Sequence, residues 1–226
     1  MKLSSFALHV LAMLLMLCDH LYLTLLPDLP ILRCVGRLAF PIFAFMAVEG
    51  YFHTRSLKKY LLRLLLLAVI SEIPFNLLVG GTVFYPGKQN VIWTLILGLL
   101  CIWGFENIAA DRQKLISAVA IIASLAAAIF ARVDYSCAGI LTLLAFYAFR
   151  GRSVRCRLLQ LLSLGFINLV LLGGIELVFP YQVLAVLSLL IIWLYDGRQG
   201  PHGRFIKAAN YLFYPAHILV LVLLAA

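Results

Sequence analysis

The chain has 226 residues, of which 65% are hydrophobic and 12% are charged, and its mean hydropathy is +1.07. A soluble domain of this size would have too little polar surface to face water, so the composition excludes a soluble globular fold. The formal net charge of +9 does not indicate nucleic-acid binding, because the basic residues follow an alternation of loops that membrane orientation explains. We expect an all-α, polytopic integral membrane bundle in a lipid bilayer, with no nucleic-acid partner.

Apolar segments recur along the whole chain, mostly with the length of about 17 to 25 residues that a tilted helix needs to cross a bilayer. The alternating pattern of about ten residues that membrane barrel strands show is absent. The sequence predicts a single domain over residues 1–226 with about nine transmembrane segments, and counts of eight or ten are the alternatives. The segments are Leu3–Leu26, Ile31–Phe52, Leu57–Val79, Asn90–Glu106, Leu115–Ala131, Tyr135–Phe149, Leu158–Gly173, Leu177–Leu194 and Ala208–Leu224.

The basic residues indicate the orientation of these segments, because Lys and Arg collect in cytoplasmic loops. With nine segments, 14 of the 18 basic residues fall on the face that carries the N-terminus. The four that remain for the other face are Arg33, Arg37, Lys88 and Arg132. We therefore expect a cytoplasmic N-terminus and an external C-terminus.

On this topology, ionisable residues within the membrane gather in its outer half. Asp19 and His20 lie in the first segment, Arg37 near the outer end of the second, Glu72 near the outer end of the third, and His217 in the ninth. Intramembrane charges are costly and commonly pair with one another, so one interpretation is that the carboxylates neutralise the outer arginines. The other is that the constellation forms a reaction site or a pathway.

A second group of basic residues lies on the predicted cytoplasmic side. Orientation in the membrane is one explanation for it. The other is a docking site for a phosphorylated cytosolic donor, since guanidinium and ammonium groups bind phosphate. The candidates are Arg55, Lys58, Lys59, Arg63, Arg150, Arg152 and Arg155. The five cysteines show neither CxxC spacing nor a histidine cluster, so we expect no metal site.

Several long motifs carry a resemblance to a known family. The run Gly36–Phe75 reads GRLAFPIFAFMAVEGYFHTRSLKKYLLRLLLLAVISEIPF. Further motifs are Met16-x-x-Asp19-His20, Gln89-Asn90, Asp134-Tyr135, Tyr195-Asp196-Gly197-x-x-Gly200 and Asn210-Tyr211-x-Phe213-Tyr214-Pro215-x-His217. With these motifs, in this order, the chain resembles the TraX family over nearly its whole length.

TraX is named for a membrane protein required for N-terminal acetylation of conjugative pilin, and the family looks similar to the acyltransferase-3 and heparan-glucosaminide acetyltransferase group. The resemblance implies a location in the bacterial cytoplasmic membrane, acetyl-CoA as cytosolic co-substrate, and a buried histidine. It leaves the acceptor open among a protein N-terminus, a glycan and a lipid. It also leaves open whether the protein forms a homo-oligomer.

Acetyl transfer suggests a role for each outer residue. His20 is the first choice for the base that takes a proton from the acceptor, and His217 is the competing base. Adjacent helical residues point about 100° apart, so Asp19 is poorly placed to orient His20 and Glu72 is preferred. Arg37 would stabilise the developing oxyanion or hold an acceptor group.

Two other functions use the same residues. A proton-coupled transporter would also need buried ionisable groups, and the prolines in Phe40-Pro41, Ile73-Pro74 and Tyr214-Pro215 suit the broken helices of such proteins. A non-catalytic membrane assembly protein would use the charges only to hold helices together. The resemblance favours the acyltransferase.

Overall fold

The computed structural model describes residues 2–173, 180–201 and 203–225, and the regular structure in these ranges is helical apart from two isolated β-bridges. The predicted all-α class is confirmed. The backbone divides into two compact units, with Met1–Met46 and Phe149–Ala226 in unit 1 and Ala47–Ala148 in unit 2. The expectation of a single domain stays a prediction.

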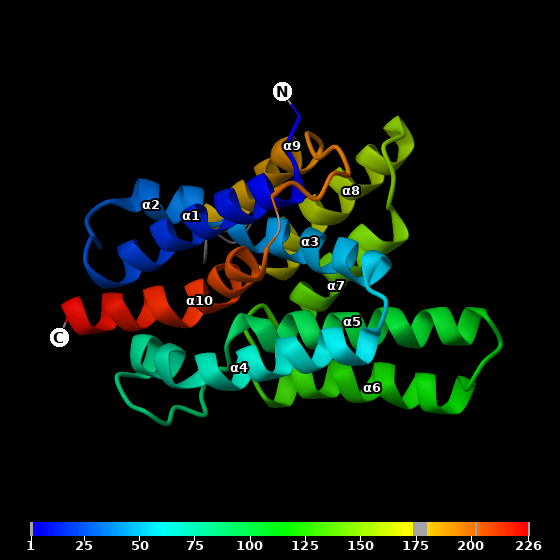
Figure 1. Cartoon of the computed structure of the whole chain (residues 1–226), viewed down its shortest axis with the longest axis horizontal. Coiled ribbons are helices and arrows are strands. Elements are labelled where there is room, and N and C mark those ends of the chain that lie inside the picture. Colours follow the sequence, from blue (N-terminus) through cyan, green and yellow to red (C-terminus); the bar gives the residue numbers. More distant parts are fainter. Residues whose placement is uncertain (1, 174–179, 202, 226) are drawn as a thin grey trace. The chain divides into compact units, whose positions relative to one another are not determined.

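Each unit is built from a few long helices and several short ones (Figure 1). Unit 1 holds α1 (Ser5–Thr24), α2 (Pro30–Gly36), the start of α3 (Ala39–His53), α8 (Val154–Phe166), the π-helix η1 (Ile167–Leu171), the 3₁₀ helix η2 (Pro180–Leu187), α9 (Ser188–Ile192) and α10 (Arg204–Ala225). Unit 2 holds the rest of α3, α4 (Leu57–Gly80), α5 (Val91–Ala109), α6 (Lys114–Phe130) and α7 (Ser136–Ala148).

Six helical stretches in the described part of the chain are long and apolar enough to cross a membrane. They are Ser5–Thr24, Pro30–His53, Leu57–Gly80, Val91–Ala109, Val154–Leu171 and Ala208–Ala225. The predicted fifth, sixth and eighth segments correspond to shorter apolar helices, Lys114–Phe130, Ser136–Ala148 and Tyr181–Ile192. The predicted count of about nine spans is therefore not confirmed, and the start of the eighth segment at Leu177 lies outside the described residues.

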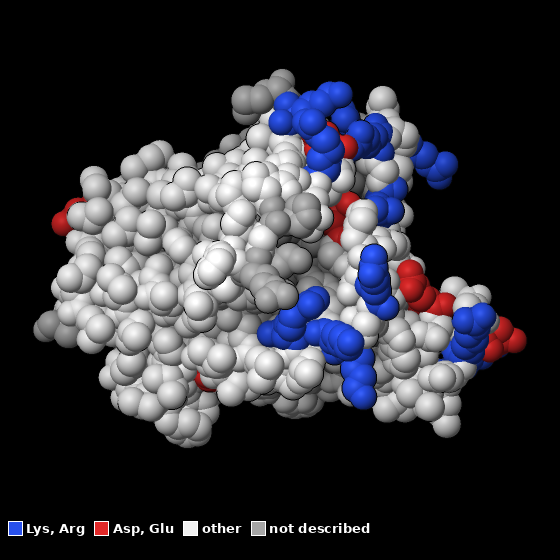
Figure 2. Space-filling view, in the orientation of Figure 1, with Lys and Arg blue, Asp and Glu red and all other residues white. Residues whose placement is uncertain are grey.

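The surface agrees with a membrane location. Leu66, Val69, Ile70 and Ile73 of α4 are each more than half exposed. Figure 2 shows wide areas without Lys, Arg, Asp or Glu, and the charged side chains gathered in a few places. Apolar side chains in such numbers on a surface are suited to lipid rather than to water.

Side-chain caps fix where the long helices begin. Ser4, Ser56 and Ser153 each accept a hydrogen bond from a backbone N–H in the first turn of the following helix, and Asn90 does the same for α5. These bonds satisfy N–H groups that have no partner within the helix, which is important where water is scarce. At the other end of α4, Gly81 adopts φ of +65°, a conformation that suits glycine.

The predicted second segment is interrupted by a turn at Arg37 and Leu38. Pro41 explains the interruption, because it has no N–H to donate and its ring would clash with the carbonyl of Arg37 in a continuous helix. The corresponding prolines of the other two predicted breaks, Pro74 and Pro215, lie inside the continuous helices α4 and α10. Only the first of the three prolines therefore coincides with a break.

In unit 2, small residues bring α5 close to its neighbours α6 and α7. A Cβ atom added to Gly98 would lie 2.8 Å from Leu143 of α7, and one added to Gly104 would lie 3.0 Å from the carbonyl oxygen of Ser117 in α6. Small residues allow such close helix packing in membranes. The buried core beside this contact contains Cys101, Ala128, Val133 and Ile140.

In unit 1, α1 and α10 pack against each other and run in the same direction (Figure 1). The backbone N–H of Ser5 donates to the carbonyl of Arg198, shortly before α10 begins, at 2.8 Å. Near the other ends of the two helices, the His20 and His217 side chains meet. The two helices are therefore parallel neighbours within unit 1, and the number of membrane crossings between them stays a prediction.

We therefore expect the two termini to lie on opposite faces of the membrane. Reporter fusions or cysteine labelling should find the N-terminus and the loops around Lys58 and Arg152 in the cytoplasm, and the C-terminus outside. The parallel α1 and α10 supply one reason, and the unequal division of basic residues supplies the other. Labelling of both termini from the same side would contradict the prediction.

Candidate functional site

Asp19 and His20 lie side by side in the interior of α1, with only 8% and 9% of their surfaces exposed. Because adjacent helical residues point about 100° apart, the two side chains face different neighbours. Asp19 contacts two arginines from the segment that begins with α2, and His20 contacts a histidine of α10. The described partners of Asp19 are therefore arginines, and which carboxylate orients His20 stays a prediction.

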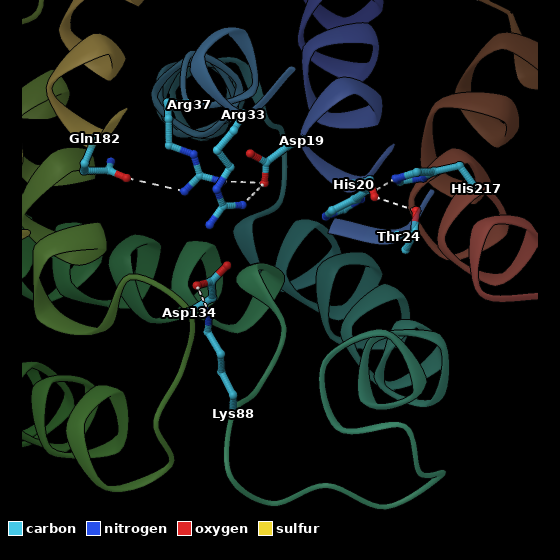
Figure 3. Close-up of polar contacts among 9 residues, drawn as sticks. All are labelled: Asp19, His20, Thr24, Arg33, Arg37, Lys88, Asp134, Gln182 and His217. Atoms are coloured by element: carbon cyan, nitrogen blue, oxygen red, sulfur yellow. Dashed lines mark hydrogen bonds and ion pairs between the residues drawn. The ribbon is translucent and has the colours of Figure 1, made fainter. Parts of the chain in front are cut away.

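Asp19 binds two guanidinium groups through one carboxylate oxygen (Figure 3). Arg33 Nη1 donates to Asp19 Oδ2 at 2.8 Å, and Arg37 Nη2 donates to the same oxygen. Arg33 and Arg37 are four residues apart and so reach the carboxylate from one side of their helix. The expected pairing of Asp19 with Arg37 is present, and Arg33 is an additional partner that we did not predict.

A glycine makes this approach possible. A Cβ atom added to Gly36 would lie 2.5 Å from Cβ and 2.8 Å from Cα of Asp19, so α2 touches the α1 backbone there. Any larger residue would push the two helices apart and separate the carboxylate from the arginines.

A chain of amide side chains continues from Arg37 into the second half of unit 1. Arg37 Nη1 donates to Gln182 Oε1 at 3.4 Å, and Gln182 Nε2 donates to Asn168 Oδ1 at 2.8 Å. Asn168 in turn donates to the carbonyl of Leu164 at 2.8 Å. Gln182 lies on η2 and Asn168 on the π-helix η1, a kind of helix that is often found at functional sites. Neither amide was among the predicted site residues.

His20 and His217 form a hydrogen bond between their rings. His20 Nδ1 and His217 Nε2 are 2.7 Å apart, and the ring planes differ by only 15°. On its other side, His217 Nδ1 lies 2.6 Å from the carbonyl oxygen of Phe213. The sequence predicts the two histidines as alternative bases, whereas the structure brings their rings into contact.

These contacts fix the tautomer of each neutral ring. A carbonyl oxygen can only accept, so His217 Nδ1 carries a hydrogen and His217 Nε2 has the lone pair. His20 Nδ1 must then be the donor to His217. The nitrogen that keeps its lone pair and has no hydrogen is His20 Nε2, so this is the atom of the pair that can accept a proton.

Neighbouring groups hold the pair in place. The ring of Phe213 stacks on that of His217 with centroids 4.6 Å apart, and the ring of Tyr214 lies 6.3 Å from that of His20. Thr24 donates to the carbonyl of His20 at 2.8 Å, which ties the last turn of α1 to the site. The ring contacts that hold the histidines therefore come from residues of α10.

Glu72 lies in unit 2, where its described partners are neutral. Asn90 Nδ2 donates to Glu72 Oε2 at 2.5 Å, and Trp93 Nε1 donates to the same oxygen at 3.0 Å. The expected ion pair between Glu72 and an outer arginine is not among the contacts of the described residues. The role of Glu72 as the group that orients His20 stays a prediction.

The predicted donor-binding residues divide between the two units. In unit 2 they lie at the turn before α4 and along its first turns, and the guanidinium of Arg63 stands 5.8 Å from the ring centroid of Tyr60. In unit 1 they lie around the start of α8, and Arg152 Nη2 donates to the carbonyl of Tyr195 at 3.2 Å. All seven side chains, Arg55, Lys58, Lys59, Arg63, Arg150, Arg152 and Arg155, are exposed.

Unit 2 contains two more polar clusters, which were hard to predict from the sequence. Glu106 accepts hydrogen bonds from the hydroxyls of Tyr51 at 2.6 Å and Tyr147 at 3.3 Å. Lys88 forms an ion pair with Asp134 at 2.9 Å, drawn in Figure 3. The one signal for the Glu106 cluster was the position of this carboxylate at the end of an apolar segment. The spacing of Tyr51 and Tyr147 along the chain did not indicate that they would contact it.

The sequence matches the family model described as TraX protein over residues 4–225. The chain belongs to the TraX family. It is 33% identical over 241 residues to the probable fimbrial assembly protein FimC, serogroup H1, of Dichelobacter nodosus, an alignment that covers 96% of this chain and 94% of that protein. It is 31% identical over 100 residues to the uncharacterized protein RP591 of Rickettsia prowazekii (strain Madrid E), covering 44% of this chain and 37% of that protein. No solved structure matches the chain.

Two of the motifs that carry the TraX resemblance meet in the histidine pair. The Asp19-His20 motif comes from α1, and the motif from Asn210 to His217 comes from α10. The parallel packing of these helices brings the two motifs together although His20 and His217 are 197 residues apart. The TraX motifs at the two ends of the chain therefore contribute to one site.

Proposed function

We propose that this chain is an integral membrane acetyltransferase of the bacterial cytoplasmic membrane, with its N-terminus in the cytoplasm and its C-terminus outside. The donor is cytosolic acetyl-CoA, and the acceptor is an amine or hydroxyl of a protein N-terminus, a glycan or a lipid. Membership of the TraX family supports this proposal. The observation that carries it is the histidine pair, which leaves His20 Nε2 with a lone pair in a buried site.

In the proposed reaction, the acceptor nitrogen or oxygen attacks the carbonyl carbon of the thioester and gives its hydrogen to His20 Nε2. The carbonyl electron pair moves to oxygen and then returns as the carbon–sulfur bond breaks. The departing thiolate takes the proton from His20, so the base is regenerated. His217 accepts a hydrogen bond from His20 Nδ1 throughout and so stabilises the positive charge that His20 acquires.

Arg33 and Arg37, together with Asp19, also have roles in the proposed reaction. Arg37 would stabilise the developing oxyanion or hold an anionic group of the acceptor, and the hydrogen bond to Gln182 limits where its guanidinium can point. Asp19 would act as a positioning residue, because it holds both Arg33 and Arg37 by one oxygen.

The exposed basic residues would bind the phosphates of coenzyme A, as the sequence suggested. We favour the set in unit 2, because Arg55, Lys58, Lys59 and Arg63 follow directly on the motif-bearing helix α3. Arg150, Arg152 and Arg155 would then serve mainly to orient the protein in the membrane.

Calorimetry of coenzyme A binding to the purified full-length protein in detergent tests this assignment. Replacing Arg55, Lys59 and Arg63 together with alanine should weaken binding at least about tenfold, because each lost charge-assisted hydrogen bond contributes a comparable factor. The matched triple alanine variant of Arg150, Arg152 and Arg155 should bind as the wild type does. Equal affinity in all three proteins would remove the α3–α4 turn from the donor site, and no binding in any would contradict the acetyltransferase.

Two specific observations favour other functions. The turn at Arg37 interrupts a span, as in the discontinuous helices of transporters, and this favours a proton-coupled transporter. The name of the Dichelobacter nodosus relative favours a non-catalytic part in fimbrial assembly. Release of free coenzyme A from acetyl-CoA by the purified protein distinguishes the enzyme from both.

A further inference from the structure

Three buried oxygen atoms near the end of α4 have no hydrogen-bond partner in the described structure: Ser71 Oγ, Glu72 Oε1 and Asn76 Oδ1. Glu72 and Asn76 are four positions apart, so their side chains lie on one face of the helix, one turn from each other. Asn76 is only 5% exposed, which leaves its amide little access to water.

The remaining polar atoms of the two side chains are engaged in hydrogen bonds. Asn90 and Trp93 donate to Glu72 Oε2. Asn76 Nδ2 donates to the carbonyl of Val83 at 3.0 Å. What is left is a pair of oxygens that can accept hydrogen bonds or bind a cation, with no hydrogen to offer.

The partners of Glu72 also set it apart from five other described carboxylates. Asp19, Asp111, Asp134 and Asp196 each have a basic partner. Glu106 receives two tyrosine hydroxyls, one on each oxygen. Glu72 has an amide and an indole on one oxygen and nothing described on the other. A carboxylate at membrane depth is costly unless a positive charge compensates it.

We propose that Glu72 Oε1 and Asn76 Oδ1 form a binding site for a small monovalent cation. Two oxygens that can only accept hydrogen bonds would repel an anion. A divalent ion usually binds more than one carboxylate, and this site offers only one. The same chemistry suits a dissolved sodium ion or the primary ammonium group of an amine. A sodium site would be independent of the proposed acetyl transfer. An amine site rests on that proposed function, because the bound amine would then be the acetyl acceptor.

Thermal unfolding of the full-length protein in detergent tests the site without any turnover. At constant ionic strength, choline chloride is exchanged for sodium chloride in one series and for methylammonium chloride in another. A bound ligand at roughly ten times its dissociation constant should raise the unfolding temperature by about 3 to 6 °C. The shift should saturate, and choline should not produce it because its quaternary nitrogen has no hydrogen to donate.

Two conservative variants locate the effect. Glu72→Gln should lose the shift, and in choline chloride it should unfold at a higher temperature than the wild type, because the uncompensated charge is gone. Glu106→Gln is the matched control in the same unit and should keep the shift, since both oxygens of Glu106 are already engaged. Should Glu72→Gln not fold, Asn76→Leu keeps the carboxylate, removes one ligand and should require about tenfold more cation.

The thermal shifts with sodium and with methylammonium distinguish the two kinds of cation and also test whether the site exists. A Glu72-dependent shift with sodium assigns the site to a dissolved ion, and one with methylammonium alone assigns it to an amine. The absence of a Glu72-dependent shift in both series overturns the site. Stabilisation by acid alone, without any response to either cation, also overturns it, because a proton would then neutralise Glu72.

Discussion

Replacing His20 with alanine should lower the rate of acetyl transfer by about 10²- to 10⁴-fold, which is the usual contribution of a general base. In the proposed reaction the lone pair of His20 Nε2 takes the acceptor proton, and alanine has no substitute for it. The measurement is release of free coenzyme A from acetyl-CoA by the purified protein in detergent, with the acceptor supplied as a membrane extract. Near-normal turnover in a monodisperse His20→Ala protein would make His20 a structural residue.

Two substitutions of His217 distinguish its hydrogen bond to His20 from its packing. His217→Gln keeps an oxygen that can accept the hydrogen of His20 Nδ1, whereas His217→Leu has none. We expect the leucine variant to lose clearly more activity than the glutamine variant. His53→Ala is the control, because His53 is exposed at the end of α3 and its ring bonds only to the carbonyl of Glu49. Equal losses in the glutamine and leucine variants would show that His217 acts through its shape alone.

Replacing Asp19 with alanine should destabilise the protein by about 3 to 5 kcal/mol, because it leaves two largely buried guanidinium groups facing each other. The free energy of unfolding in mixed detergent and denaturant gives the effect directly. The triple variant in which Asp19, Arg33 and Arg37 are all leucine should recover much of the loss, since no unpaired charge remains.

The control for Asp19 is an aspartate whose ion pair is exposed to solvent. Asp111 pairs with Lys114, and their side chains are 77% and 64% exposed. Asp111→Ala should change stability by less than about 1 kcal/mol, because solvent screens an exposed pair. Similar losses of stability in Asp19→Ala and Asp111→Ala would mean that burial does not strengthen the ion pairs of Asp19 with Arg33 and Arg37.

Much of the fold followed from the sequence because apolar runs are local signals. The predicted fifth segment, Leu115–Ala131, differs from α6 by one residue at each end. The turn at Arg37 was harder to place, because Pro41 ends one helix while Pro74 and Pro215 do not end theirs. Whether a proline breaks a helix depends on the packing around it, which the sequence alone does not contain.

The site was predictable where its partners are close in sequence. Asp19 and Arg37 are 18 residues apart, at the two sides of one tight turn, so their pairing could be expected. The relation between His20 and His217 could not, because it depends on which helix packs beside α1. The same holds for Gln182 and Asn168, which are ordinary polar residues until η1 and η2 bring them together.

The order in which the chain is made adds a consequence to the histidine pair. Proteins leave the ribosome from the N-terminus, so Asp19 can find Arg33 and Arg37 as soon as the first two spans have entered the membrane. His217 follows His20 by 197 residues, on α10, and can reach it only after the helices between them have left the ribosome. A nascent chain that holds the first hairpin in the bilayer therefore already has its ion pairs and still lacks the histidine pair.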